Sequence, residues 1–86
     1  MKQIVYKPQG TCSQLITLSG EGGRLTDVSF AGGCNGNLQG LSSLVRGMKY
    51  EDVIAKLQGI RCGMKRTSCP DQLAEAVRLL MAQEGA

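Results

Sequence analysis

Histidine and tryptophan are absent from this chain of 86 residues, and only three of its residues are aromatic. Without histidine the chain cannot build a Ser–His–Asp triad, which excludes that route to nucleophilic catalysis. Because aromatic side chains contribute the largest buried areas, their scarcity leaves a small hydrophobic core. A domain of this size is in the range where a cross-link or a bound metal helps to decide whether the chain folds.

The chain also lacks long apolar runs. None approaches the roughly 20 residues that a membrane-spanning helix requires, and the N-terminus has no apolar stretch of the secretory kind. We therefore expect no membrane association and a cytoplasmic location. Thiols stay reduced in the cytoplasm, so two disulfides are a minor alternative for the four cysteines.

A strong excess of charge of one sign is missing too. The formal net charge is +3, and the basic residues cluster only at Arg61, Lys65 and Arg66, around Cys62. A nucleic-acid-binding domain of this size usually has a denser basic face, often with aromatic residues for base stacking. The sequence therefore predicts no nucleic-acid partner.

The N-terminal third of the chain has the alternation of β-strands. Residues 2–7 form a short predicted strand that ends at Pro8. Residues 15–19 and 24–30 predict a hairpin around a glycine-rich turn at residues 20–23. These segments together predict a three-stranded antiparallel sheet.

The apolar period becomes helical after the sheet. It predicts one helix from Asn37 to about Gly47 and a second from Tyr50 to Gly59. The apolar positions of the first helix are Leu38, Leu41, Leu44, Val45 and Met48.

A third helix follows an irregular loop at residues 61–68. Pro70 suits the first helical position, which makes Cys69 the predicted N-cap. The apolar stripe of this helix consists of Leu73, Val77, Leu80 and Met81. Strands followed by helices indicate an α+β fold, with about three helices packed on the sheet, in a single domain spanning residues 1–86.

The four cysteines are Cys12, Cys34, Cys62 and Cys69, separated by 21, 27 and 6 residues. No C-x-x-C pair exists, so the spacing matches neither a zinc finger nor a zinc ribbon. A metal site made from these residues would have to be assembled by the tertiary fold.

Placement is more informative than spacing. Cys12 lies in the loop before the predicted hairpin, Cys34 between the hairpin and a helix, and Cys69 at a helix start. Such loops often converge at one end of a two-layer fold, and helix N-termini stabilise thiolates. A cysteine usually packs as a small hydrophobe, but none of the four lies in an apolar stripe. We therefore favour metal binding, followed by a thiol–disulfide redox role and then by inert thiols.

Residues 67–71 read Thr-Ser-Cys-Pro-Asp, and this stretch resembles the signature of the TSCPD domain. That domain occurs at the C-terminus of adenosylcobalamin-dependent ribonucleotide reductases and as a free-standing four-cysteine protein. The resemblance implies an ancestral link to ribonucleotide reduction and a protein partner, with a reductase as the candidate. A reductase needs a large barrel with nucleotide and cofactor sites, which this chain is too short to hold. We expect no enzyme activity from the chain on its own.

A second resemblance is to the U-type iron–sulfur cluster assembly scaffolds. Cys12 is similar to their first cluster cysteine, Cys34 in Gly-Gly-Cys-Asn-Gly-Asn to the second, and Cys69 to the third. The resemblance implies a scaffold-like fold, in which a three-stranded sheet is followed by helices.

The chain departs from the scaffold pattern at three positions. Gln14 replaces the aspartate that helps to keep the scaffold cluster labile, and Ser68 replaces the histidine before the third cysteine. Cys62 has no clear counterpart. A fourth thiolate in place of labile donors predicts a closed site that retains its metal, with zinc as the default and an iron–sulfur cluster as a compatible alternative.

Three functional hypotheses follow. The first is a metal-binding accessory domain, which metal removal should partly or wholly unfold because the core is small. The second is a thiol–disulfide partner of a reductase that uses Cys62 and Cys69. The third is an interaction module whose basic loop, residues 61–66, contacts an acidic protein partner. An iron–sulfur cluster scaffold is a further alternative, and the sequence leaves the oligomeric state open.

Overall fold

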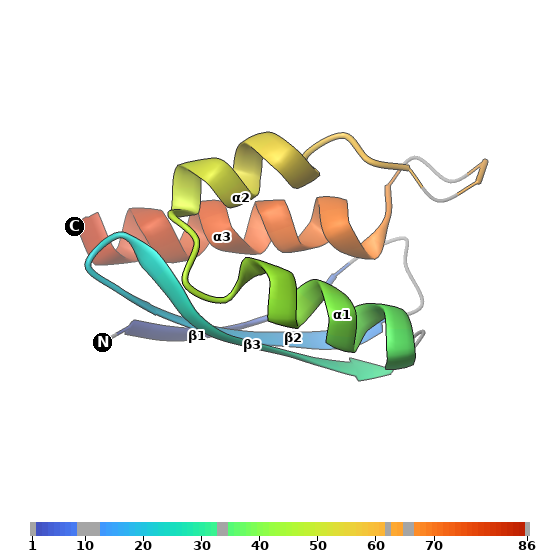
Figure 1. Ribbon diagram of the computed structural model, residues 1–86, viewed down its shortest axis with the longest axis horizontal. Coiled ribbons are helices and arrows are strands. Elements are labelled where there is room, and N and C mark those ends of the chain that lie inside the picture. Colours follow the sequence, from blue (N-terminus) through green and yellow to red (C-terminus); the bar gives the residue numbers. More distant parts are fainter. Residues whose placement is uncertain (1, 9–12, 33–34, 62, 65–66, 86) are drawn as a thin grey trace.

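Three strands precede three helices in the computed structural model, which describes residues 2–8, 13–32, 35–61, 63–64 and 67–85 (Figure 1). The elements are β1 (Lys2–Tyr6), β2 (Ser13–Glu21), β3 (Arg24–Gly32), α1 (Asn35–Val45), α2 (Tyr50–Leu57) and α3 (Cys69–Gly85). This order confirms the predicted α+β fold. In the described part of the chain, no helix has the length and apolar character needed to cross a membrane.

The sheet is antiparallel, in the order β1–β2–β3. Tyr6, the last residue of β1, lies opposite Ile16 of β2. The hairpin between β2 and β3 turns at Gly22 and Gly23, whose φ angles are +61° and +82°. Positive φ at both central residues is typical of a type I′ turn, which matches the twist of the flanking strands and favours glycine.

Both hairpin strands are longer than the sequence predicts. Gly20 was expected in the turn, but it belongs to β2 and lies opposite Leu25, next to a register shift between Ser19 and Gly20. At the far end, β3 continues to Gly32. Strand pairing therefore outweighs the low β-propensity of glycine at these positions.

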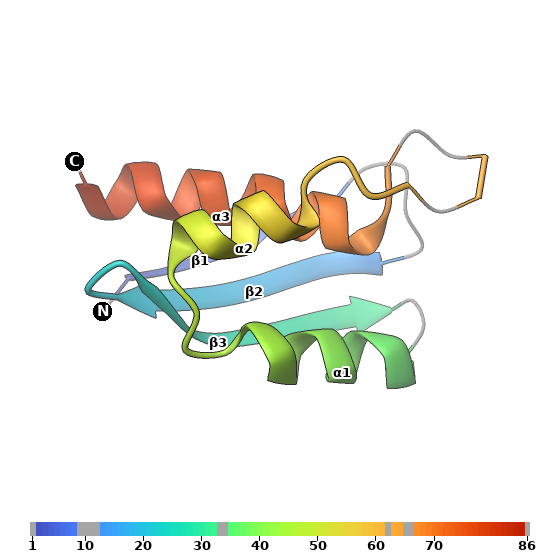
Figure 2. The ribbon, with the colours of Figure 1, turned by 45° about the horizontal axis from the view of Figure 1, so that its top comes forward.

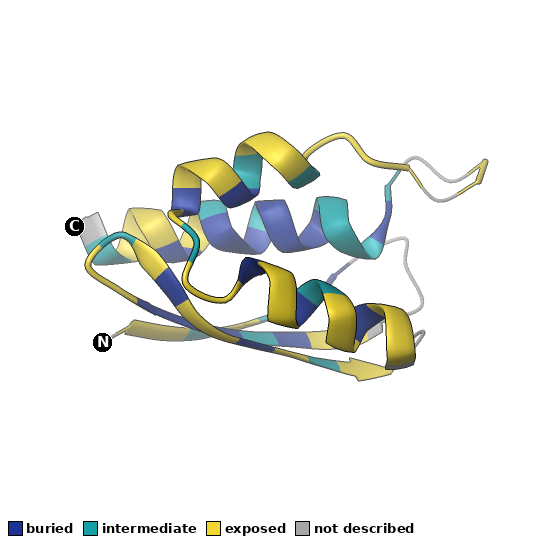
Figure 3. Cartoon of the chain, viewed as in Figure 1, coloured by how far each residue is buried: buried dark blue, intermediate teal, exposed yellow. Residues whose placement is uncertain are grey.

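The helices cover one face of the sheet. α3 packs on β1 and β2, α1 packs on β3, and α2 packs against α3 (Figures 1 and 2). Buried positions lie where the helices meet the sheet and each other (Figure 3). The core cluster contains Ile16, Leu18, Leu25, Val28, Val45, Tyr50, Val53, Leu73, Ala76, Val77 and Leu80. Burial of a large apolar side chain contributes about 1.5–3 kcal/mol, so this cluster is the main source of cohesion.

The first helix differs from its prediction in its bounds and its inner face. It runs from Asn35 to Val45 instead of from Asn37 to about Gly47, and Leu44 is 76% exposed. The inner position goes to Ser42, one turn after Leu38, and its hydroxyl donates to the Leu38 carbonyl oxygen at 2.9 Å. A serine that bonds its own helix can be buried, so the apolar pattern was wrong about Leu44.

The stripe predicted for the last helix is mostly confirmed. Leu73, Val77 and Leu80 are completely buried, whereas Met81 is 37% exposed. Ala76, which the prediction left out, is also completely buried. Small residues on a helix allow close packing, which an apolar count weighted toward large side chains does not detect.

Candidate functional site

The structure describes one of the four cysteines predicted as metal ligands. Cys69 is half-buried and is the first residue of α3. Cys12, Cys34 and Cys62 lie outside the described residues. No group of three or more histidine, cysteine, aspartate or glutamate residues within the described ranges could hold a metal ion. Those ranges do not include the other three cysteines, so the four-cysteine site stays a prediction.

The described residues that flank the cysteines in sequence lie at one end of the sheet. Ser13, immediately after Cys12, lies opposite Gly32 at the end of β3. α1 begins at Asn35, immediately after Cys34, and α3 begins at the same end of the fold (Figures 1 and 2). The β2–β3 turn and the end of α3 lie at the opposite end. The described residues next to Cys12 and Cys34 therefore lie at the same end of the fold as Cys69.

The cap of α3 differs by one residue from the prediction. Ser68 is the N-cap, because its Oγ accepts a hydrogen bond from the Asp71 N–H at 3.1 Å and its carbonyl oxygen accepts one from the Gln72 N–H at 2.9 Å. Cys69 occupies the first helical position and Pro70 the second. A hydroxyl is a much better capping acceptor than a thiol. The predicted cap at Cys69 was therefore wrong.

Ser68 also fastens the loop that precedes α3. Its hydroxyl donates a hydrogen bond to the carbonyl oxygen of Ile60 at 2.6 Å. Ile60 lies two residues before Cys62, and Ser68 lies immediately before Cys69. One side chain thus caps the helix and holds together the segments that lead to two of the cysteines.

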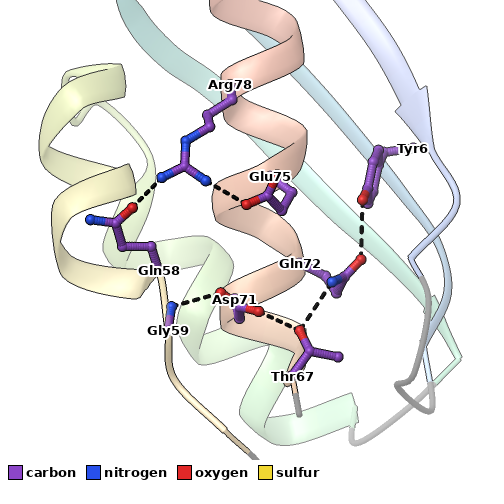
Figure 4. A network of polar contacts seen from close by, with 8 residues as sticks. All are labelled: Tyr6, Gln58, Gly59, Thr67, Asp71, Gln72, Glu75 and Arg78. Atoms are coloured by element: carbon purple, nitrogen blue, oxygen red, sulfur yellow. Dashed lines mark hydrogen bonds and ion pairs between the residues drawn. The ribbon is translucent and has the colours of Figure 1, made fainter.

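Asp71 of the Thr-Ser-Cys-Pro-Asp motif makes a second connection. Its carboxylate accepts a hydrogen bond from the Thr67 hydroxyl and one from the Gly59 N–H at 2.6 Å (Figure 4). The Thr67 hydrogen bond is the main cause that lowers the pKa of Asp71, followed by the Gly59 N–H; the positive charges of Arg78 and Arg61 add to the effect, and burial opposes it. The carboxylate therefore stays ionised and acts as a hydrogen-bond acceptor.

Gln72 extends these contacts to the sheet. Its Nε2 donates to Thr67 Oγ1 at 3.0 Å, and its Oε1 accepts from the Tyr6 hydroxyl at 3.1 Å (Figure 4). Burial is the main cause that raises the pKa of Tyr6, with smaller contributions from the charges of Glu75 and Asp71. The tyrosine therefore stays protonated and donates. We call these connected residues the Thr67 network: Tyr6, Gly59, Thr67, Asp71 and Gln72.

The sequence reveals only part of this network. Asp71 and Gln72 lie in the first turn of a predicted helix, where polar side chains commonly bond to free backbone N–H groups, and both also bond to Thr67. The link between Tyr6 and Gln72 spans 66 residues of sequence and has no sequence signal. It exists because α3 packs on β1.

A separate polar cluster lies at the opposite end of α3. Glu84 accepts a hydrogen bond from the Gly23 N–H at 2.9 Å and one from the Tyr50 hydroxyl. These bonds lower the pKa of Glu84, with Tyr50 as the larger cause, while burial and the Glu84 contact raise the pKa of Tyr50. The cluster fastens the end of α3 to the β2–β3 hairpin, far along the helix from Cys69.

These features describe a small α+β domain in which the cysteine-bearing connections leave one end of a helix-covered sheet. The chain belongs to the TSCPD domain family, which matches residues 2–81. The matched region includes all four cysteines and the motif at residues 67–71. Comparison with curated proteins and with solved structures gave no significant match.

Proposed function

We propose that the chain is an accessory domain that holds one metal ion through Cys12, Cys34, Cys62 and Cys69. The observation that carries this proposal is the placement of the described residues next to Cys12, Cys34 and Cys69 at one end of the fold. The loop before Cys62 is tied to the start of α3 through the Ser68 hydroxyl. Four thiols from separate segments could then meet without a C-x-x-C pair.

The donor set fits zinc best. Zn²⁺ favours four tetrahedral ligands, and a site with four thiolates is closed and structural. Four thiolates around a divalent ion carry a net negative charge, which the N-terminus of α3 and the exposed side chain of Arg61 would offset. When bound, the ion would act as a cross-link between segments. An iron–sulfur cluster on the same four thiolates is the alternative cofactor.

Metal analysis together with thiol counting tests the proposal. Protein purified without oxidation should contain one equivalent of zinc per chain, and its four thiols should react with a thiol reagent only after chelation. Replacement of Cys62 by serine should abolish stoichiometric retention, because a three-thiolate site is open and loses its metal more readily. Less than half an equivalent of metal, with four reactive thiols in the untreated protein, would contradict the proposal.

A thiol–disulfide role is the second candidate function, and one contact favours it. The Ser68–Ile60 hydrogen bond brings the segment before Cys62 next to the residue before Cys69, and proximity of the two cysteines is what a redox pair requires. Reversible oxidation near the cytosolic potential, in protein that binds no metal, would favour this role over metal binding.

The proposal includes a protein partner and a cytoplasmic location. The loop before α3 presents the exposed residues Arg61 and Met64, and Lys65 and Arg66 follow them in sequence. An acidic surface suits this loop, and the family relationship makes a reductase the first partner to test. Binding to a candidate partner should weaken after charge reversal at Lys65 and Arg66, and unchanged binding would exclude this surface.

A further inference from the structure

The cysteine end of the fold contains a set of polar contacts that capping of α3 does not require. Ser68 alone provides the N-cap. The Thr67 network is additional, and it joins three separate parts of the chain: the end of β1, the loop after α2 and the start of α3 (Figure 4). The network therefore connects these three parts of the chain to one another, in addition to the capping of α3.

We propose that the Thr67 network aligns the segments that carry Cys12, Cys62 and Cys69, and so sets the metal affinity of the site. The inference rests on the proposed function, and it assigns a positioning role to residues that bind no metal themselves. Tyr6 lies six residues before Cys12, Gly59 three residues before Cys62, and Thr67 two residues before Cys69.

The Thr67 hydroxyl is the centre of the network. A hydroxyl has one proton to donate and lone pairs to accept, and Thr67 uses both by donating to Asp71 and accepting from Gln72. Since the Gln72 amide donates to Thr67, its oxygen faces Tyr6. Loss of this one hydroxyl would remove one hydrogen bond from Asp71 and one from Gln72, and would therefore weaken the positions from which Asp71 holds Gly59 and Gln72 holds Tyr6.

The network matters for affinity because the ligands come from distant parts of the sequence. Without prior alignment, metal binding would have to supply the free energy for closing the loops between them. Outer contacts that orient metal ligands typically change affinity by about 10–100-fold. We therefore expect a measurable affinity change from residues that do not touch the ion.

The test compares hydroxyl deletions at the two ends of the molecule. Tyr6→Phe and Thr67→Val each remove a hydroxyl from the network, whereas Tyr50→Phe removes a tyrosine hydroxyl that is bonded to Glu84 at the opposite end. Thr67→Ser keeps the hydroxyl and is the conservative variant. The affinity for Co²⁺ is measured from its thiolate charge-transfer band, against a competing chelator, at a temperature where every variant is folded.

The expected results separate positioning from stability. Thr67→Val should weaken Co²⁺ binding by about tenfold or more and alter the visible spectrum of the bound ion, whereas Thr67→Ser should stay within about twofold of the wild type. Tyr50→Phe should lower the melting temperature and leave the affinity unchanged. If Thr67→Val does not fold, Tyr6→Phe replaces it in the test, and we expect Tyr6→Phe to lose less Co²⁺ affinity. Equal affinities for wild type and network variants would overturn the inference, as would an equal loss in Tyr50→Phe.

A second probe distinguishes failure of the inference from failure of the proposed function. In reduced, metal-free protein, phenylarsonous acid bridges two neighbouring thiols by exchanging two arsenic–oxygen bonds for two arsenic–sulfur bonds, with release of water. Suppose that the wild type binds no Co²⁺, but Thr67→Val binds phenylarsonous acid more weakly than the wild type does. The metal proposal then fails and the positioning role stands. If Co²⁺ binds wild type and Thr67→Val equally, the positioning role fails and the metal proposal stands. A wild type that binds neither probe would overturn both.

Discussion

Gly20 of β2 lies against the side chain of Tyr50, the first residue of α2. A Cβ atom on Gly20 would lie 1.8 Å from Tyr50 Oη and 2.7 Å from its Cζ, far inside van der Waals contact. Tyr50 is 1% exposed and its hydroxyl donates to Glu84, so the ring cannot shift without losing core packing or this hydrogen bond. Only glycine therefore fits at this strand position, despite its poor β-propensity.

Replacement of Gly20 by alanine should lower the free energy of unfolding by about 1–3 kcal/mol, the usual cost of overpacking a filled core. Gly40→Ala is the matched control, because a Cβ at this position in α1 would meet no described residue within 4 Å beyond its own stretch of helix. This control should stabilise the protein by up to about 1 kcal/mol, since alanine is the better helix former. Urea unfolding of both variants measures the two changes, and changes of the same sign would contradict this packing.

At the residue scale, sequence patterns predict which apolar side chains are buried better than they predict which polar side chains contact each other. Leu73, Val77 and Leu80 follow a helical period, and all three are buried as expected. The contact between Tyr50 and Glu84 joins residues 34 apart, and it depends on how α2 and α3 dock. No local pattern encodes such a pair.

At the element scale, the Glu84 carboxylate fastens the end of α3 to the β2–β3 hairpin. Glu84 accepts hydrogen bonds from Tyr50 and from Gly23, and these lower its pKa below the ordinary value of 4.5. A carboxyl group whose pKa is lowered in the folded state stabilises the fold at pH values above its unfolded pKa. This contribution is lost as the pH falls through the folded pKa.

Replacement of Glu84 by glutamine should therefore destabilise the protein at pH 7 and matter progressively less as the solution is acidified below about pH 4.5. The free energy of unfolding, measured in urea at pH 7 and pH 3 for both proteins, checks the expectation. If the free energies of unfolding of the wild type and Glu84→Gln differ by the same amount at both pH values, the charge of the carboxylate does not contribute to this contact.

Element order was predictable from the sequence, while element ends were not. The change from a two-residue to a helical period after β3 predicts strands followed by helices, and the structure has this order. The start of α3 depends on whether the Ser68 hydroxyl or the Cys69 thiol reaches the free N–H groups, and the hydroxyl does. Such choices between adjacent residues depend on local geometry that a pattern cannot resolve.

The described fold as a whole combines a continuous core with cysteine-bearing connections at one end. The α+β class follows from the sequence, and the family relationship is established over residues 2–81. For the candidate site, the sequence predicts the ligands and the end of the fold at which they lie, but three of these cysteines lie outside the described residues. Their convergence therefore stays a prediction.

Metal removal should lower the thermal stability of the whole domain. A ligand that binds only the folded state at 1,000 times its dissociation constant stabilises by about 4 kcal/mol, and about 1 kcal/mol shifts the melting temperature of a domain this small by roughly 4–8 °C. Chelation should thus lower the melting temperature by more than about 10 °C, measured by circular dichroism. A melt that does not change after complete removal would show that the metal is not structural.

X-ray absorption spectroscopy at the zinc edge, on protein purified without oxidation, tests the central claim most directly. The account predicts one zinc per chain with four sulfur neighbours at about 2.3 Å, one from each of Cys12, Cys34, Cys62 and Cys69. A first shell with three sulfurs and a nitrogen or oxygen, or protein that contains no bound metal, would contradict the closed four-cysteine site.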